Sequence, residues 1–369
     1  MPVHSDDANL SDAAPVPRPQ HIDLSHLIRL TDDTGLFQHA LYAVPDPTHG
    51  YCIDDNARAL LACVRYLHQV GEDPRVSSLM RRYLAFVAYA YNAERGLFRN
   101  FMSYDRRWLE TRGSEDSQGR TAWALGLTVR DARATDVRDL AGDLFRKALP
   151  GLGGLGHIRS WAFALLGLNA YLDYEPGYAP ALALRKRFAA ALHQAYRARA
   201  TPDWPWWEDL VTYDNAKLGQ ALFQTGQALG DNTMCGDAAT ALRWLIDQQT
   251  AVGDNGHTHL SIIGNDGWLK PGVARAVYDQ QPLEAWALVE ACAVLANGLA
   301  CDRETASYWR SRAMWCLGWF LGANDAGQPL ADLATAGCRD GLQASGPNAN
   351  QGAESTLSWL LAQLAVQKL

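Results

Sequence analysis

Six segments of the chain share one pattern, in which a loop rich in Trp, Tyr, Gly and acidic residues leads into a helix with a polar first turn and an apolar remainder. These segments span 49–62, 113–126, 156–167, 205–223, 278–291 and 350–362. Each of the first five is followed by a second, more charged stretch with helical periodicity. Internal repetition of this kind indicates a repeat architecture, here one of helical hairpins.

Apolar residues recur at positions i, i+3, i+4 and i+7 along the whole chain, whereas alternating β-branched runs bounded by turns are scarce. This pattern predicts an all-α fold. The predicted helices span 22–43, 55–70, 75–94, 118–131, 134–149, 157–174, 178–200, 214–230, 233–250, 281–299, 303–322 and 352–368.

The helices predicted to start at 55, 118, 157, 214, 281 and 352 are poor in charge. A helix that is apolar nearly all round is buried on most sides. The alternate helices, such as the stretch 183–200, carry Arg and Lys on one face. We therefore expect six inner helices wrapped by an outer ring, a closed (α/α)6 toroid in which the first helix lies beside the last inner one.

Small residues on two of the inner helices would let those helices approach closely. They are Ala122, Ala124, Gly126, Ala162, Ala164 and Gly167. An open α-solenoid built from the same hairpins is the alternative. Long connections favour the closed ring, because open arrays usually have short, regular repeats and these connections all precede inner helices. They are 96–117, 201–213, 251–280 and 323–351.

Composition favours a globular protein and disfavours nucleic acid and membrane partners. With 48% hydrophobic and 20% charged residues, the 369-residue chain is expected to be globular. A net charge of −7 without blocks of like charge disfavours nucleic acid and membrane partners. The sequence contains no apolar run of 18 residues, so no membrane-spanning helix is predicted. Residues 1–21 lack a signal-peptide pattern and read as a disordered tail, which leaves 22–369 as one barrel domain.

The seven cysteines are scattered and form no CxxC pair. An odd number of thiols without an export signal predicts a cytoplasmic protein with reduced cysteines. His and Cys never cluster at ligand spacing, so we expect no metal and no cofactor. The run GLGGLG at 151–156 follows no strand, and we interpret it as a connector between helices.

Pairs of acids open the first two inner helices. Asp54 and Asp55 follow an aromatic residue, and Glu115 and Asp116 precede Arg120 by one turn. One acid of each pair could serve only as a helix cap. Two adjacent acids beside aromatic and cationic residues point to a functional role for at least one member of each pair.

The loop before the fourth inner helix contains Trp204, Trp206 and Trp207, followed directly by Glu208 and Asp209. Three tryptophans within four loop positions are not all expected to enter the core. Flat apolar faces beside hydrogen-bond acceptors are what a sugar ring requires. This segment therefore indicates a carbohydrate ligand.

The last two inner helices open in the same way. Asp279, Gln281 and Glu284 follow a Gly-rich loop that contains Trp268, and Glu354 takes the equivalent place in the sixth repeat. Glu284 could instead favour only the helix dipole. Because all six openings meet at one end of a toroid, we expect an oligosaccharide site at that end.

The predicted site residues fall into two groups. The catalytic carboxylates are expected among Asp55, Glu115, Asp116, Glu208, Asp209 and Asp279, with Glu208 or Glu115 as general acid. Substrate binding is assigned to His49, Tyr51, Asp54, Arg120, His157, Trp204, Trp206, Trp207, Asp214, Trp268, Gln281, Glu284 and Glu354.

The segments HGYCIDDNARAL, EDSQGRTAWALG, WWEDLVTYDNAKL, YDQQPLEAWA and GAESTLSW together resemble a bacterial helical domain described as glycosyltransferase-associated. The resemblance covers about residues 22–369. It implies the (α/α)6 toroid of six-hairpin glycosidases and a functional link to a glycosyltransferase or a glycoside phosphorylase. No nucleotide-sugar domain is evident, so the resemblance does not imply glycosyl transfer.

The leading hypothesis is glycoside hydrolysis of short oligosaccharides, such as β-linked mannosides or glucosides, by two carboxylates. Acids on different inner helices would suit the wider spacing of inverting enzymes. One alternative is a sugar epimerase or isomerase of the same fold, which would use histidine bases drawn from His49, His157 and His259. The other is a glycan-binding partner of a glycosyltransferase system without turnover.

Overall fold

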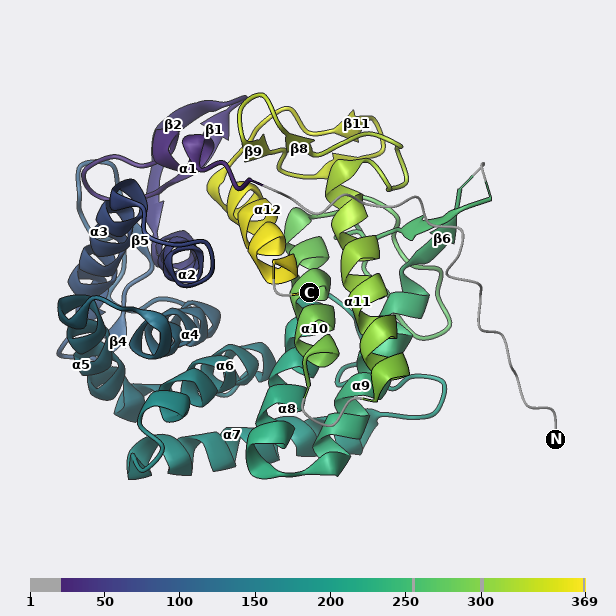
Figure 1. Ribbon diagram of the computed structural model, residues 1–369, viewed down its shortest axis with the longest axis horizontal. Coiled ribbons are helices and arrows are strands. Elements are labelled where there is room, and N and C mark those ends of the chain that lie inside the picture. The colour runs from purple at the N-terminus through teal and green to yellow at the C-terminus, as the bar shows by residue number, and fades with distance from the viewer. Residues whose placement is uncertain (1–20, 254–255, 299–301, 368) are drawn as a thin grey trace.

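Helices follow one another around a closed ring in the computed structural model, which describes residues 21–253, 256–298, 302–367 and 369 (Figure 1). The inner helices are α2 (Ile53–Gln69), α4 (Glu115–Asp131), α6 (Ile158–Tyr174), α8 (Asn215–Leu229), α10 (Pro282–Ala296) and α12 (Ala353–Val366). The outer helices are α3 (Pro74–Ala90), α5 (Thr135–Leu152), α7 (Ala179–Arg199), α9 (Asn232–Gln248) and α11 (Arg303–Gly318), which continues into the 3-10 turn η2 (Trp319–Leu321).

Each inner helix packs against the inner helices before and after it, and α12 packs against α2. The ring is therefore closed, which confirms the (α/α)6 toroid and excludes the open solenoid. The eleven helices predicted from residue 55 onward are present with ends displaced by at most four residues. The inner helices are buried nearly all round, most completely α10, as their lack of charge predicted.

Local sequence sets several helix ends. The side chain of Asp73 caps α3 directly before Pro74, and Asp231 and Asp302 cap α9 and α11 in the same way. Gly230 ends α8 in the left-handed conformation that favours glycine.

The closest approach between inner helices lies between α4 and α6. A Cβ atom on Gly126 would lie 2.1 Å from the carbonyl oxygen of Gly167, and a Cβ on Gly167 would lie 2.3 Å from the carbonyl oxygen of Ala122. Backbone therefore meets backbone at this contact, as the small residues in both helices predicted. No side chain can move away to make room for a methyl group.

We expect Gly126→Ala to lower the free energy of unfolding by about 1 to 3 kcal/mol, because the added methyl group forces α4 away from α6. The matched control is Gly236→Ala on α9, where nothing lies within 4 Å of the added Cβ. That change should stabilise the fold by up to about 1 kcal/mol, because glycine in a helix costs backbone entropy. Urea unfolding of both variants measures the contrast, and equal effects would contradict it.

The predicted helix at 22–43 is wrong. A short helix, α1 (Ser25–Arg29), packs on α12 and is followed by the antiparallel strands β1 (Phe37–Leu41) and β2 (Val44–Cys52). The turn between α1 and β1 is fixed by Asp32, whose carboxylate accepts hydrogen bonds from the N–H groups of Thr34 and Gly35 at 2.8 and 3.1 Å. An Asp side chain that binds the backbone in this way competes with helix formation.

Short strands, which the scarcity of strand patterns did not predict, occupy the connections. β5 (Phe101–Met102) adds to β1 and β2 to form a three-stranded sheet. The remaining strands pair locally: β3 (Tyr91–Asn92) with β4 (Leu97–Phe98), β6 (Thr250–Val252) with β7 (Thr258–Leu260), β8 (Ala331–Asp332) with β9 (Gly337–Cys338), and β10 (Leu342–Gln343) with β11 (Gly346–Pro347).

Three further predictions concern the chain as a whole. The six cysteines in the described residues are unpaired, and five of them are buried. In that part of the chain no helix is long and apolar enough to cross a bilayer. A disordered tail was expected at 1–21, and residues 1–20 of it lie outside the described residues.

Candidate functional site

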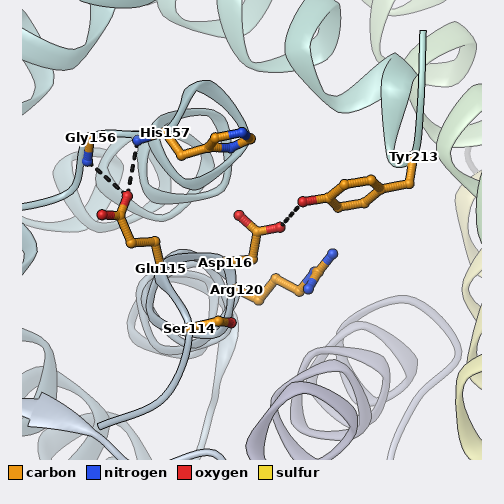
Figure 2. Close-up of a pocket in the computed structure, with 7 residues that line it drawn as sticks. All are labelled: Ser114, Glu115, Asp116, Arg120, Gly156, His157 and Tyr213. Atoms are coloured by element: carbon orange, nitrogen blue, oxygen red, sulfur yellow. Dashed lines mark hydrogen bonds between the residues drawn. The ribbon is translucent and has the colours of Figure 1, made fainter. Parts of the chain in front are cut away.

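A cavity of about 590 Å³ opens where α4 and α6 begin and directly before the start of α8 (Figure 2). It lies at the end of the toroid where the acidic helix openings were predicted to gather. Its lining residues are Ser114, Glu115, Asp116, Arg120, Gly156, His157 and Tyr213. Glu115, Asp116, Arg120 and His157 were predicted site residues, whereas Tyr213 was missed.

Glu115 joins the first turn of α4 to the start of α6. Its Oε2 accepts hydrogen bonds from the backbone N–H groups of Gly156 and His157 at 2.8 and 2.9 Å. Burial alone would raise the pKa of Glu115, but these two hydrogen bonds, together with the Ser160 hydroxyl and the charge of Arg112, hold the pKa below its ordinary value. Glu115 is therefore ionised at neutral pH, which argues against the general-acid role expected for it.

Asp116 lies beside Glu115 and faces Tyr213 across the cavity (Figure 2). The Tyr213 hydroxyl donates a hydrogen bond to Asp116 Oδ2 at 2.7 Å. Burial, together with this hydrogen bond, raises the pKa of Tyr213, so its phenol remains a proton donor. The Ser160 hydroxyl lies 3.4 Å from Asp116 Oδ1 and also 3.4 Å from Glu115 Oε2. The two carboxylate oxygens are therefore no farther apart than twice that distance.

Arg120 connects three inner helices beneath the cavity. Its Nη1 donates to Asp54 Oδ1 on α2 at 3.1 Å, and its Nη2 donates to Asp214 Oδ2 before α8 at 2.6 Å. Its guanidinium carbon also lies 4.5 Å from the centre of the Phe163 ring on α6. Burial opposes the charge, but Asp54, Asp214 and Asp116 hold the pKa of Arg120 well above its ordinary value.

Glu284 caps α8 from the neighbouring helix α10. Its carboxylate accepts hydrogen bonds from the backbone N–H of Asp214 and from Asn215 Nδ2, the latter at 2.9 Å. Asp214 stands at the N-cap position with φ of 49°, yet its side chain makes no capping hydrogen bond and instead binds Arg120. Burial, and then the charge of Asp214, raise the pKa of Glu284 to about 7.

Glu284 should make the fold less stable as pH rises. The folded protein keeps the proton up to about pH 7, whereas the unfolded chain loses it near the ordinary value of 4.5. This contribution to stability is therefore full below the unfolded pKa and is lost between about 4.5 and 7. We expect the free energy of unfolding of the wild type, minus that of Glu284→Gln, to fall by on the order of 2 kcal/mol over this window. Urea titrations at both pH values measure the difference, and a constant difference would refute the assignment.

Asp55 belongs to an ion-pair chain between α2 and α12. Arg58 donates to Asp55 Oδ1 at 3.0 Å and to Glu354 Oε2 at 2.9 Å. Burial raises the pKa of Asp55 to about 6. Both acids contact Arg58 and neither lines the cavity. In this structure Asp55 and Glu354 therefore join α2 to α12 and do not face the cavity.

Glu208 acts through Arg159, a buried residue of α6 that was not singled out from the sequence. Arg159 Nη1 donates to Glu208 Oε2 at 2.7 Å, while its Nε donates to the carbonyl of Tyr213 at 2.6 Å. Glu208 therefore holds the segment that presents Tyr213 to the cavity. Glu208 is not among the residues that line this cavity, so its position does not support the general-acid role expected for it.

The expected tryptophan platform is wrong. Trp206 and Trp207 are 0% and 1% exposed, so neither ring has a face open to a sugar. They pack against Trp244 of α9 and Tyr196 of α7, while Trp204 is half-buried and donates to the Glu208 carbonyl. The outer helices on either side of this repeat cover the loop, which the loop composition alone did not reveal.

Three more predicted residues lie away from the cavity. Asp209 is 83% exposed and pairs with Arg199. His49 lies exposed on β2, with its ring against His39. Tyr51 is buried, and its hydroxyl donates to Asp32 at 2.6 Å. Asp209 is therefore a surface residue, and Tyr51 belongs to the core.

The opening of α10 does not reach the cavity either. Trp268, Asp279 and Gln281 are half-buried and are not among the lining residues. His259 Nε2 lies 3.2 Å from Asp325 Oδ1 and likewise does not line the cavity. Within the described ranges, no group of three or more His, Cys, Asp or Glu residues is arranged to hold a metal ion.

No protein-family model and no curated protein matches this sequence. Solved structures do match. A sugar epimerase from a ruminal bacterium superposes with a TM-score of 0.66 at 12% identity, covering 92% of this chain and 94% of the other. An inactive variant of an α-1,6-mannanase of Salegentibacter sp., in complex with α-1,6-mannotriose, gives 0.61 at 14% identity over 93% and 96%. A D-mannose isomerase gives 0.66 at 12% identity over 93% and 94%. These similarities show the fold.

Proposed function

We propose that the protein is a glycoside hydrolase that cleaves short oligosaccharides with Glu115 and Asp116. One observation carries this proposal: these consecutive residues are the only carboxylates among the described residues that line the 590 Å³ cavity. A polar cleft with two carboxylates at different hydrogen-bonding positions is the minimum that glycoside hydrolysis needs. The volume lies within the range of known ligand sites.

The two carboxylates receive different roles from their surroundings. Glu115 is held ionised by two backbone N–H groups, so it is assigned as the nucleophile that attacks the anomeric carbon. Asp116 is assigned as the acid that protonates the leaving oxygen as the glycosidic bond breaks. In the second step Asp116 takes a proton from water, and that water releases the sugar from Glu115.

The positions of Tyr213 and Arg120 fit the assignment of Glu115 as nucleophile and Asp116 as acid. Tyr213 donates to Asp116 Oδ2. The other oxygen, Oδ1, has among the described residues only the long 3.4 Å contact with the Ser160 hydroxyl and is the one assigned to act on the substrate. Arg120 is committed to Asp54 and Asp214, so it fixes the base of the cavity. Tyr213 therefore orients the reacting carboxylate, Arg120 fixes the floor beneath it, and neither residue titrates at neutral pH.

The spacing of the pair favours retention of configuration over the inversion expected from the sequence. Both carboxylates reach the same Ser160 hydroxyl, so their oxygens are at most twice 3.4 Å apart. This upper limit falls at the lower end of the roughly 6.5 to 9.5 Å at which inverting enzymes hold their carboxyl groups to admit a water. The inverting hypothesis assumed acids on different helices. The cavity instead presents neighbouring residues of one helix.

The mannanase neighbour adds independent support. Its inactive variant carries replacements at two consecutive aspartates. An adjacent acidic pair is thus needed for activity in one enzyme of this fold, and Glu115–Asp116 is the adjacent pair at the cavity of this chain.

An epimerase or isomerase of the same fold is the rival enzyme class, and solved examples are among the neighbours. Such an enzyme would use histidine bases, and two histidines facing each other across the cavity would favour it, but the described residues do not provide such a pair. His157 alone lines the cavity, since His49 is exposed on the hairpin and His259 pairs with Asp325. This arrangement favours hydrolysis.

Cytoplasmic location and a link to a glycosyltransferase or glycoside phosphorylase are further proposals, carried by the thiol pattern and the resemblance. Fractionation of native cells tests the first of these. Recovery of the protein from outside the cytoplasm with oxidised cysteines would refute it.

The proposed function is tested by incubating the protein with β-1,2-, β-1,4- and α-linked manno- and gluco-oligosaccharides and analysing the products by mass spectrometry. We expect shorter oligosaccharides to appear from at least one linkage. Products of unchanged mass but altered sugar identity would favour the epimerase. Binding without product would favour the glycan-binding partner.

A further inference from the structure

A second cavity, of about 300 Å³, opens at the opposite end of the toroid, where the inner helices finish. Five of its lining residues are carboxamides from three helices. They are Gln69 on α2, Gln220, Gln224 and Gln227 on α8, and Asn297 directly after α10. No reaction assigned above uses this cavity.

The two cavities are separated along the axis of the ring. Trp123 of α4 stacks on Trp286 of α10 with ring centres 5.9 Å apart and an angle of 3°. The buried ammonium group of Lys217 lies 4.2 Å from the Trp286 ring and 5.0 Å from the Trp123 ring. On α4, Arg120 lines the first cavity and Trp123 lines the second. Trp123 therefore forms the floor of the second cavity, and Trp286 and Lys217 support its ring from behind.

The charges around the second cavity are already paired. Glu290 binds both Arg65 and Lys217, the latter at 2.7 Å, and Arg130 binds Asp131 at 2.7 Å. Burial lowers the pKa of Lys217 and would raise that of Glu290, but the cations Arg65 and Lys217 hold the Glu290 pKa at about 2. Arg130 also pairs with Asp173 at 3.3 Å, so three cations meet three carboxylates and the described lining offers no uncompensated charge to an ionic ligand.

Two of the five carboxamides have unused hydrogen-bonding capacity, whereas the Gln220 amide is bonded to Lys217 and Glu290. Gln69 Oε1 and Gln227 Nε2 are buried atoms with no hydrogen-bond partner among the described residues. One is an acceptor and the other a donor. A buried polar atom without a partner costs free energy, and a hydroxyl group can satisfy either kind because it both donates and accepts.

We propose that this second cavity is a binding site for a neutral sugar of about one ring, distinct from the hydrolytic cavity. Paired charges exclude an ionic ligand class, the amides select hydroxyl groups, and 300 Å³ lies at the lower limit of small-molecule sites. This proposal does not depend on the reaction at Glu115 and Asp116.

The test uses the full chain with methyl-labelled Leu and Val, because Leu127, Leu166 and Val294 line the second cavity. D-mannose is titrated across the millimolar range while methyl NMR spectra are recorded. We expect saturable shifts at these three residues. D-glucosamine and D-glucuronate, which match the ring but carry a charge, should shift them less at equal concentration.

Two variants localise the effect. Gln224→Leu combined with Gln227→Leu should weaken D-mannose binding at least about tenfold, because two hydrogen-bonding groups are lost. Gln224→Leu alone should weaken it about threefold and serves if the double variant does not fold. Asp116→Asn, at the other end of the ring, should leave the shifts unchanged.

Any of four results would overturn the proposal. The first is no shift at Leu127, Leu166 and Val294, and the second is a Gln variant that binds D-mannose as the wild type does. The third is a charged sugar that binds as tightly as D-mannose. The fourth is the loss of the shifts in Asp116→Asn. The last of these would place the sugar in the hydrolytic cavity. Failure of hydrolysis with the shifts retained would instead affect only the proposed function.

Discussion

Asp116→Asn should lower kcat on the cleaved oligosaccharide by about 10³-fold, the range expected when an enzyme loses its general acid. The amide oxygen can still accept the hydrogen bond from Tyr213, so the cavity keeps its shape while the group loses its proton. Stability should change little, because the Asp116 side chain is only half-buried. Turnover and urea unfolding of the same sample separate the two effects.

Glu115→Gln should cause a loss of similar size, since the neutral amide is a poor nucleophile. Asp209→Asn is the matched control, because Asp209 is 83% exposed and pairs with Arg199 away from the cavity. Its activity should equal that of the wild type. Turnover retained by both Asp116→Asn and Glu115→Gln would show that the catalytic pair has been assigned to the wrong residues.

Arg120→Met should lower the free energy of unfolding by about 3 to 5 kcal/mol, the cost of leaving buried charges unpaired. The Arg120 guanidinium is nearly inaccessible and holds Asp54 and Asp214, which belong to opposite parts of the ring. The variant leaves both carboxylates without their cation. Urea unfolding at neutral pH measures the loss.

Arg199→Met provides the contrast for Arg120. Its ion pair with Asp209 is exposed, so removing it should cost no more than about 1 kcal/mol. Equal effects in the two variants would mean that the Arg120 network does not stabilise the ring.

The helical toroid was predictable from sequence because its inner helices are buried on nearly every side. That burial requires an almost uncharged stretch, such as 282–296, and a Gly where backbones meet, as at Gly126 and Gly167. The hairpin at 37–52 was not predictable in the same way. A single side chain, Asp32, redirects the backbone there, while the apolar spacing before and after it is also compatible with a helix.

The candidate site was predictable as a location more than as a set of roles. Acids at helix openings marked the end of the ring at which the cavity of Glu115 and Asp116 opens, yet Glu284 caps α8 and Asp55 pairs with Arg58. Trp206 and Trp207 enter the core because α7 and α9 cover them, a tertiary contact that loop composition does not encode. Tyr213 was missed, although its place directly before Asp214 repeats the Tyr278–Asp279 pair that opens the fifth repeat.

The central claim is that the cavity at Glu115 and Asp116 adds water across a glycosidic bond. The most direct measurement is a digest of the cleaved oligosaccharide in H2(18)O, with a parallel reaction in D2O, both followed by mass spectrometry. The account predicts one (18)O atom in the fragment released from the glycosyl-enzyme and no carbon-bound deuterium in either cleavage fragment. With Asp116→Asn, neither cleavage fragment should form. Carbon-bound deuterium in an uncleaved sugar, without (18)O, would contradict the account and identify an epimerase or isomerase.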